Sequence, residues 1–316
     1  MEERPPISTP LLVFNFTLIG IISILGFLVY VTPKTDYALY SKEDPKIDSR
    51  VFSELSIRAQ GFVVYDIEQR TVLYGRHTET PLPLASITKV MTALTARELV
   101  PPGTVVTIRP EFLKEEGDSG LYGDEKWKLK DLLDYALIVS SNDGARAIAS
   151  VAGATSLATP EYNLGRERFI KDMNTKAKEL GLVSFKFHNE TGLDSSSSLS
   201  GGYGSPLDVA KLFAYILSKY PDVFEATTKQ VDTMYSEDNK KHSAENTNQA
   251  LKDIPNILAS KTGFTELAGG NLAIVFDAGI GRPIAVVVLG STEQDRFLDV
   301  TKLVDATLRY IETNNK

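Results

Sequence analysis

The sequence predicts an α/β (α+β) fold: an antiparallel sheet built from strands at both ends of the folded part, flanked by helices and joined to a helical subdomain. Near the start, residues 61–66 and 71–74 are apolar or alternating runs separated by a polar turn, which is a strand-turn-strand signal. Near the end, residues 271–277 and 283–289 are rich in β-branched side chains and fit two buried strands. Segments with helical spacing lie between these runs, so strands far apart in the chain must share one sheet.

Residues 11–31 form an apolar stretch without a charged side chain. A helix of this length, at about 1.5 Å per residue, spans the roughly 30 Å hydrocarbon layer of a bilayer. Core helices seldom run this long without a polar face, so residues 1–32 are predicted to be a membrane segment. A cleaved signal peptide is the alternative, but the only basic residue before the stretch is Arg4, and Asp36 stands at the −3 position of the nearest candidate cleavage point, after Ala38. These features favour a retained anchor.

Residues 33–50 contain two prolines and several charges without periodicity, which predicts a juxtamembrane linker. Residues 51–316 are predicted to form one folded domain. Its first long helix is expected from Ser86 to Val100, because apolar residues recur at helical spacing and two prolines and a glycine follow. Further predicted elements are helices over 129–151 (broken around 140–144), 168–181, 205–220 and 292–310, and a surface loop over 195–198.

Composition argues against several classes of protein. The net charge of −7 disfavours a nucleic-acid partner, because phosphates require a basic face. The absence of cysteine excludes disulfides, thiolate metal sites and cysteine nucleophiles. The histidines, His77, His188 and His242, form no His-Glu-x-x-His pattern, and none lies in a context that suggests a catalytic base. Each is therefore expected to be an ordinary surface residue.

Three short motifs occur in one order along the chain. They are Ser-x-x-Lys at 86–89, Ser-x-Asn at 140–142 and Lys-Thr-Gly at 261–263. Each alone is common, and would otherwise mark an exposed helix face, a turn or cap, or a strand end. All three in order, each in the structural context that its chemistry requires, indicate a hydrolase with a serine nucleophile.

The first motif places Ser86 at a helix start with Lys89 one turn on and on the same face. A lysine that is partly desolvated and crowded by other cations has a lowered pKa, so its neutral amine can take the serine proton. The N–H of Ser86 can form half of an oxyanion hole. In the second motif, Ser140 can relay a proton to the leaving amine, and Asn142 can hold a substrate carbonyl and the lysine together.

The third motif is predicted to lie on an edge strand. There Lys261 would add positive charge, and Thr262 would offer a hydroxyl to a substrate carboxylate. Gly263 would leave room for the substrate backbone to approach. The N–H of Phe264 could complete the oxyanion hole.

With these residues the chain resembles the penicillin-binding serine D-alanyl-D-alanine carboxypeptidases of the low-molecular-mass type, which have a β-lactamase/transpeptidase-like fold. The resemblance covers about residues 50–312 and goes beyond the three motifs. The segments that carry it are 84–94, 131–143, 173–182, 188–194, 246–248 and 261–269.

The resemblance implies that a peptidoglycan stem peptide ending in D-Ala-D-Ala acylates Ser86, that D-alanine is released and that water hydrolyses the acyl-enzyme. It also implies covalent inhibition by β-lactams and no metal or organic cofactor. The expected location is the cell membrane, with a single pass through residues 1–32 and a catalytic domain, residues 51–316, outside the cytoplasm. Four basic residues follow the apolar stretch and one precedes it, which by itself would favour the opposite orientation.

The chain departs from the family in two respects. Ser141 and Gly144 stand where the family often has Gly and Ala. Family members also commonly carry a second, all-β domain and a C-terminal amphipathic membrane helix. This chain ends soon after its last predicted strand, so it is expected to lack both, with the N-terminal segment in place of that anchor.

Four alternatives remain at this point. A D,D-endopeptidase of peptidoglycan cross-links shares every motif. A β-lactamase would have Asp where this chain has Ser141 and a Glu-x-x-Leu-Asn pattern, which neither Glu161 nor Glu167 forms. A non-catalytic penicillin-binding sensor would not need all the catalytic positions intact. If the chain were a membrane-tethered interaction protein, the presence of the three motifs in this order would be a coincidence.

Overall fold

The computed structural model describes residues 50–117, 120–279 and 281–314. The predicted membrane segment, residues 1–32, and the linker up to residue 49 lie outside the described residues. None of the helices described is both long and apolar enough to cross a membrane.

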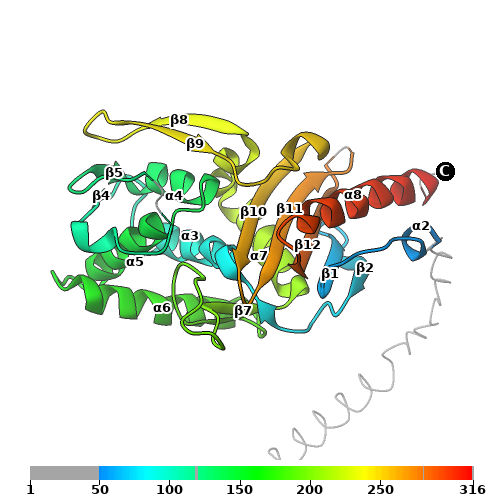
Figure 1. Cartoon of the computed structure of the whole chain (residues 1–316), viewed down its shortest axis with the longest axis horizontal. Coiled ribbons are helices and arrows are strands. Elements are labelled where there is room, and N and C mark those ends of the chain that lie inside the picture. The colour runs from blue at the N-terminus through cyan, green and yellow to red at the C-terminus, as the bar shows by residue number, and fades with distance from the viewer. Residues whose placement is uncertain (1–49, 118–119, 280, 315–316) are drawn as a thin grey trace, which may run out of the picture. The chain divides into compact units, whose positions relative to one another are not determined.

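The central sheet is antiparallel and joins strands from the two ends of the domain (Figure 1). Its strands, in spatial order, are β10 (Ile257–Thr265), β11 (Gly269–Asp277), β12 (Pro283–Ser291), β1 (Gly61–Asp66) and β2 (Thr71–Arg76). Gly61 lies opposite Leu289, which joins the N-terminal hairpin to the C-terminal strands. The predicted fold class is therefore confirmed, including the sheet made from chain-distant parts.

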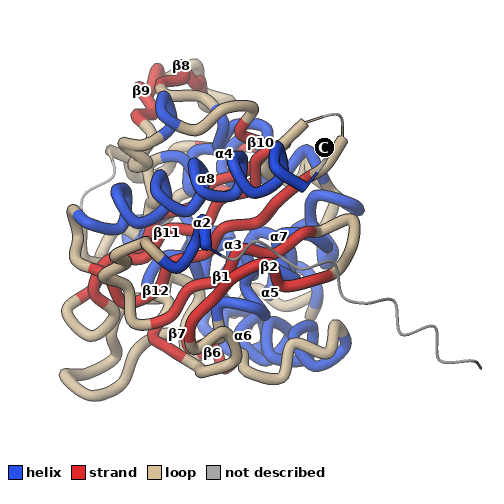
Figure 2. Tube along the Cα trace, turned by 90° about the vertical axis from the view of Figure 1, so that its right-hand side faces the viewer, coloured by secondary structure: helices blue, strands red, loops and turns tan. Residues whose placement is uncertain are grey.

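Both faces of the sheet are buried, each under a different helix. Val63 and Tyr65 belong to the core that contains α7 (Pro206–Lys219). Phe62 and Val64, which alternate with them, belong to the core under α8 (Asp295–Asn314). Figure 2 shows α8 lying across one face of the sheet. Because side chains of a strand point alternately to opposite faces, a fully apolar strand fits between two helical layers.

The remaining helices include a group that forms the predicted helical subdomain, seen to the left of the sheet in Figure 1. These helices are α3 (Thr88–Leu99), α4 (Leu129–Ile138), α5 (Asn142–Ser156) and α6 (Tyr162–Glu179). The other elements are α2 (Arg50–Ser53), the 3₁₀ helices η1 (Ala85–Ile87), η2 (Pro110–Phe112), η3 (Pro221–Val223), η4 (Glu225–Thr228) and η5 (Leu251–Asp253), and the strands β3 (Leu82–Pro83), β4 (Val105–Thr107), β5 (Lys126–Lys128), β6 (Lys186–Phe187), β7 (Gly202–Gly204), β8 (Val231–Tyr235) and β9 (Lys241–Glu245).

Several helix boundaries differ from prediction: α5 extends to Ser156 and not 151, and α8 spans Asp295–Asn314 and not 292–310. The break between α4 and α5 is shorter than expected, because the Ser141 hydroxyl accepts a hydrogen bond from the Gly144 N–H and so caps α5 at its first residue. Helix α6 begins at Tyr162, six residues before the predicted start at 168.

His242 is buried, so the expectation of a surface histidine is wrong for this residue. Its Nε2 lies 2.6 Å from Oε1 of Glu125, and its ring packs beside Trp127 and Tyr135. The partner carboxylate is 117 positions away in sequence, so no local pattern could reveal the pair. The pair joins β9 to the loop before β5.

Candidate active site

Ser86 lies in η1, the single 3₁₀ turn that leads directly into α3. The residue before it, Ala85, has φ of 47°, a left-handed conformation that an alanine adopts only at a cost in free energy. The predicted placement of the serine at a helix start is thus close, but the serine occupies the tight turn and not the α-helix itself. Such a turn presents the side chain of Ser86 outside the regular helix surface.

Lys89 is buried and its amine has three acceptors, which come from three different segments. The Nζ atom lies 2.8 Å from Ser86 Oγ and 2.6 Å from Asn142 Oδ1. It lies 2.8 Å from the backbone carbonyl of Thr191. The amine is therefore held against the serine hydroxyl with its hydrogen-bonding capacity filled.

Burial lowers the pKa of Lys89 to about 7, because desolvation disfavours the charged form of the amine. The nearby carboxylates of Glu190 and Glu115 act in the opposite direction and raise that pKa. Crowding by cations, the other cause expected from the sequence, acts on the neighbouring Lys261, whose pKa the charges of Lys89 and Arg296 lower. A neutral amine beside a serine hydroxyl can act as a general base near neutral pH.

Ser140 lies in the loop between α4 and α5 in a left-handed conformation, with φ of 63°. Its hydroxyl accepts a hydrogen bond of 2.8 Å from Nζ of Lys261. Asn142 begins α5, and its Nδ2 donates to the backbone carbonyl of Glu116 at 2.6 Å. The amide thus links the amine of Lys89 to a loop that borders the site.

Lys261 lies on β10, which is an edge strand of the sheet as predicted. Its amine is buried and also donates to its neighbour's carbonyl, Thr262 O, at 3.0 Å. Burial lowers the pKa of Lys261 well below its ordinary value, and the positive charges of Lys89 and Arg296 lower it further. The Thr262 hydroxyl lies 2.6 Å from that of Thr247.

Gly263 allows β10 to lie directly against the serine turn. A Cβ at this position would stand 2.8 Å from the carbonyl oxygen of Leu84 and 3.1 Å from the backbone nitrogen of Ser86. No side chain fits there without a shift of backbone. Phe264 follows, with its ring 42% exposed at the mouth of the site.

The structure adds residues that the motifs did not indicate. Thr191 supplies a carbonyl to Lys89, and Thr247 a hydroxyl to Thr262; both lie in segments that the resemblance covers, but without an assigned role. Arg296 is nine-tenths buried and donates from Nη1 to the Gly263 carbonyl at 2.8 Å. It lies on α8, where nothing in the sequence distinguishes it from other charged residues of a helix.

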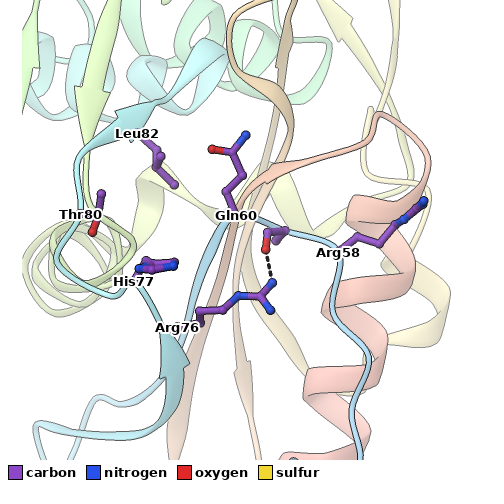
Figure 3. Close-up of a pocket in the computed structure, with 7 residues that line it drawn as sticks. Arg58, Gln60, Arg76, His77, Thr80 and Leu82 are labelled. Carbon is purple, nitrogen blue, oxygen red and sulfur yellow. Dashed lines mark hydrogen bonds between the residues drawn. The ribbon is translucent and has the colours of Figure 1, made fainter.

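A cavity of about 440 Å³ adjoins the exposed ring of Phe264. Its lining residues are Glu116, Leu193, Asp194, Ser196, Ser197, Phe264, Thr265, Glu266 and Leu267. A different cavity, of about 590 Å³, lies beside the start of β1 and the end of β2 (Figure 3). It is lined by Arg58, Arg76 and His77 among others, and by none of the motif residues. The first cavity thus borders the candidate site at Phe264, whereas Ser86 and Lys89 line neither cavity.

Comparison with known proteins agrees with this geometry. Residues 48–293 match the sequence profile of Peptidase S11, D-alanyl-D-alanine carboxypeptidase. The chain is 34% identical over 275 residues to the D-alanyl-D-alanine carboxypeptidase DacF of Bacillus subtilis, which covers 85% of this chain and 67% of that protein. It is 32% identical over 221 residues to a D-alanyl-D-alanine endopeptidase of Haemophilus influenzae, covering 69% of this chain and 70% of that protein.

Among solved structures, Penicillin-Binding Protein D2 of Listeria monocytogenes in its cefotaxime-bound form has a TM-score of 0.67 and 27% sequence identity. The superposition covers 80% of this chain and 98% of that chain. The chain therefore belongs to the Peptidase S11 family of D-alanyl-D-alanine carboxypeptidases, and it is a serine peptidase.

Proposed function

We propose that the chain removes the terminal D-alanine from peptidoglycan stem peptides through an acyl-enzyme on Ser86. The observation that carries the proposal is the 2.8 Å contact between Lys89 Nζ and Ser86 Oγ, made by an amine whose pKa lies near neutrality. A serine hydroxyl is a weak nucleophile until a neighbouring base takes its proton. Lys89 has both the position and the pKa that this proton transfer requires.

In the proposed acylation, the Ser86 hydroxyl proton passes to the Lys89 amine while Oγ bonds to the carbonyl carbon of the penultimate D-alanine. The carbonyl π electrons move onto oxygen, and the N–H groups of Ser86 and Phe264 hold the oxyanion. The close approach of β10 to the serine turn, permitted by Gly263, supports this pair of donors. The oxyanion then collapses and the bond to the leaving nitrogen breaks.

The leaving amine must receive a proton, and Ser140 is proposed to relay to it the proton that Lys89 took from Ser86, which leaves the Lys89 amine neutral again. Its hydroxyl is bonded to Lys261, and Asn142 connects the same region to Lys89. Water then attacks the ester carbonyl, with Lys89 again taking a proton, and the ester bond to Ser86 breaks. The proton on Lys89 then passes to Ser86 Oγ, which restores the free serine hydroxyl and releases the shortened peptide.

The substrate's terminal carboxylate is proposed to bind along β10, at the hydroxyl of Thr262 and beside the amine of Lys261. Arg296 supports this assignment, because its buried guanidinium adds positive charge directly behind Gly263. No metal or organic cofactor takes part in the proposed steps. β-Lactams, which present a reactive amide to the same serine, are proposed to acylate Ser86 and remain attached.

We also propose that residues 1–32 hold the enzyme to the cell membrane by a single pass, with the catalytic domain, residues 51–316, outside the cytoplasm. The apolar stretch over 11–31 and the location of peptidoglycan support this arrangement. Residues 33–50 would then be the tether.

The test is covalent labelling of the purified protein by a fluorescent penicillin. Labelling is expected for the parent chain and absent in Ser86→Ala. Ser141→Ala, at the variable middle position of the second motif, serves as a control that changes a helix cap and not the nucleophile. Label on the Ser86→Ala protein would contradict the nucleophile assignment. Free D-alanine released from a diacylated peptide ending in D-Ala-D-Ala tests the reaction itself.

Endopeptidase action on cross-links is the second candidate, favoured by the similarity to a protein named D-alanyl-D-alanine endopeptidase. Incubation with cross-linked peptidoglycan separates the two activities. Loss of cross-linked dimers, scored by chromatography, would indicate the endopeptidase, and loss of only the terminal residue would indicate the carboxypeptidase. A β-lactamase would instead release the hydrolysed antibiotic rapidly, and a sensor would bind it without turning over peptide.

A further inference from the structure

The loop of residues 189–194 packs against the turn that carries the nucleophile. Gly192 has φ of 83°, and a Cβ there would stand 1.9 Å from the carbonyl oxygen of Ala85, so the two backbones are in direct contact. The Thr191 carbonyl accepts from Lys89. The preceding carbonyl, that of Glu190, accepts from the Thr92 hydroxyl at 2.7 Å, one helical turn beyond Lys89.

The side chain of Glu190 is fully buried behind this loop. Its Oε1 lies 2.8 Å from Nε of Arg166 on α6, and Oε2 has no hydrogen-bond partner among the described atoms. A buried carboxylate costs several kcal/mol of desolvation, and a half-satisfied one is hard to account for by packing alone. A buried negative charge on Glu190 is therefore better explained by a role in the site than by the stability of the fold.

We propose that Glu190 and Arg166 are a positioning pair for the reaction: they fix the Thr191 carbonyl on Lys89 and keep a buried negative charge beside its amine. The inference rests on the proposed role of Lys89 as base. Neither residue touches substrate in this arrangement, and both act through the lysine.

Several other charged groups surround Lys89, and each belongs to a different element. They are Glu115, which follows η2 and pairs with Arg146 of α5; Asp143 of α5, which accepts from the Glu115 N–H; Lys261 of β10; and Arg166 of α6 behind Glu190. Glu190 is the largest electrostatic influence that raises the pKa of Lys89, ahead of Glu115. Its removal should therefore be visible above the background of the other groups.

The direction in which each variant shifts the pH midpoint of acylation follows from the charge that it removes. Without the carboxylate of Glu190 the ammonium form of Lys89 is less stable, so the amine is neutral at lower pH and the acylation rate rises earlier. Without Arg166, while Glu190 stays ionised, the uncompensated carboxylate stabilises the ammonium form, and the rise moves to higher pH. Two variants of one ion pair are thus expected to move one midpoint in opposite directions.

The experiment measures the rate of acylation of the full chain by a fluorescent penicillin as a function of pH. For Glu190→Gln the midpoint is expected to fall by about 0.5–1 pH unit. At pH values below the midpoint the rate, relative to its plateau, should then rise about threefold to tenfold. For Arg166→Gln the midpoint is expected to rise. The matched control is Glu98→Gln. It breaks a different ion pair, in which the carboxylate of Glu98 on α3 lies 2.6 Å from the amine of Lys176 on α6, and it should leave the midpoint unchanged.

A folded Glu190→Gln protein whose midpoint coincides with that of the parent would overturn the proposal, even if its plateau rate fell, since that result describes a merely structural residue. If Glu190→Gln does not fold, Arg166→Gln tests the proposal instead. The side chain of Arg166 is partly exposed, so its replacement should disturb the fold less. An unchanged midpoint in Arg166→Gln would overturn the proposal equally. Failure of the proposed function has a different signature, namely labelling that survives Ser86→Ala, or no labelling of the parent.

Discussion

At the scale of single residues, the site depends on a lysine that the fold holds in an unfavourable environment. The ammonium form of Lys89 is destabilised by burial, and hydrogen bonds from its nitrogen to Ser86, Asn142 and Thr191 only partly compensate. The consequence is an amine with a pKa of about 7, whose neutral form is available near neutral pH. A surface lysine would be neutral in only about one molecule in a thousand at that pH.

This environment predicts the direction of the pH dependence. The base must be unprotonated to take the serine proton, so the rate of acylation by a β-lactam should be low in acid, rise through a midpoint near pH 7 and then reach a plateau. The measurement is the second-order labelling rate at a series of pH values. A midpoint near the ordinary lysine value of about 10 would show that the amine is not desolvated in solution.

Replacement of the amine tests the same residue independently. Lys89→Met keeps the length of the side chain and removes the base, and the acylation rate should fall by about 10²–10⁴-fold, the usual contribution of a general base. Lys171→Met, an exposed lysine on α6, is the control and should label like the parent. Equal loss in both variants would point to a general effect of charge, not to a base at position 89.

At the scale of elements, α8 ties the segment before β1 to the end of the neighbouring strand β12 through one carboxylate. Asp299 is buried and accepts hydrogen bonds from the N–H groups of Arg58 and Ala59 at 3.0 Å, just before β1. It also accepts from the Ser291 hydroxyl at 2.7 Å, at the end of β12. The helix therefore anchors the first and last strands of the central sheet at the same point.

Asp299→Ala should lower the free energy of unfolding by about 2–4 kcal/mol, since it leaves the buried Ala59 N–H, the buried Ser291 hydroxyl and the partly buried Arg58 N–H without their acceptor. Urea denaturation checks this value, with Asp305→Ala on the exposed side of the same helix as the control, expected to change stability by less than about 0.5 kcal/mol. A change of similar size in both variants would show that helix propensity, and not the buried hydrogen bonds, is responsible.

Elements whose signal is local could be predicted from the sequence. Runs of β-branched residues predicted the strands β11 and β12. The Lys-Thr-Gly motif predicted that Gly263 lies on an edge strand where another backbone comes close. Ser141 shows the limit of such reasoning: as a cap it moves the start of α5 to Asn142, and the sequence alone suggested a longer break. The first residue of a helix depends on which side chain accepts a hydrogen bond from a free backbone N–H. The three-dimensional geometry decides this, not the local sequence.

At the scale of the whole molecule, the candidate site is a set of long-range contacts, and these are what the sequence could not reveal. The bond between Lys261 and Ser140 joins residues 121 positions apart, and that between Lys89 and Thr191 joins residues 102 apart. The motifs predicted which side chains take part. They could not predict Arg296, whose role depends on α8 lying behind β10, or the burial of Glu190.

The proposed membrane segment can be separated from the catalytic domain because every described contact of the site lies within residues 84–296. A chain that lacks residues 1–32 should therefore be labelled by a fluorescent penicillin at the same rate as the full chain. The two should differ in a flotation gradient of cell lysate. The full chain should rise with the membranes, since a stretch of about 20 apolar residues suffices to span a bilayer, and the shortened chain should stay at the bottom.

The control in the same gradient is the full chain with Ser86→Ala, which should float with the membranes but carry no label. Together the three proteins separate attachment from catalysis, because each loses one property at most. A shortened chain that still floats would place membrane binding in the folded domain. A full chain that stays at the bottom would show that residues 1–32 are removed or do not insert, and a shortened chain without label would show that these residues support the catalytic domain directly.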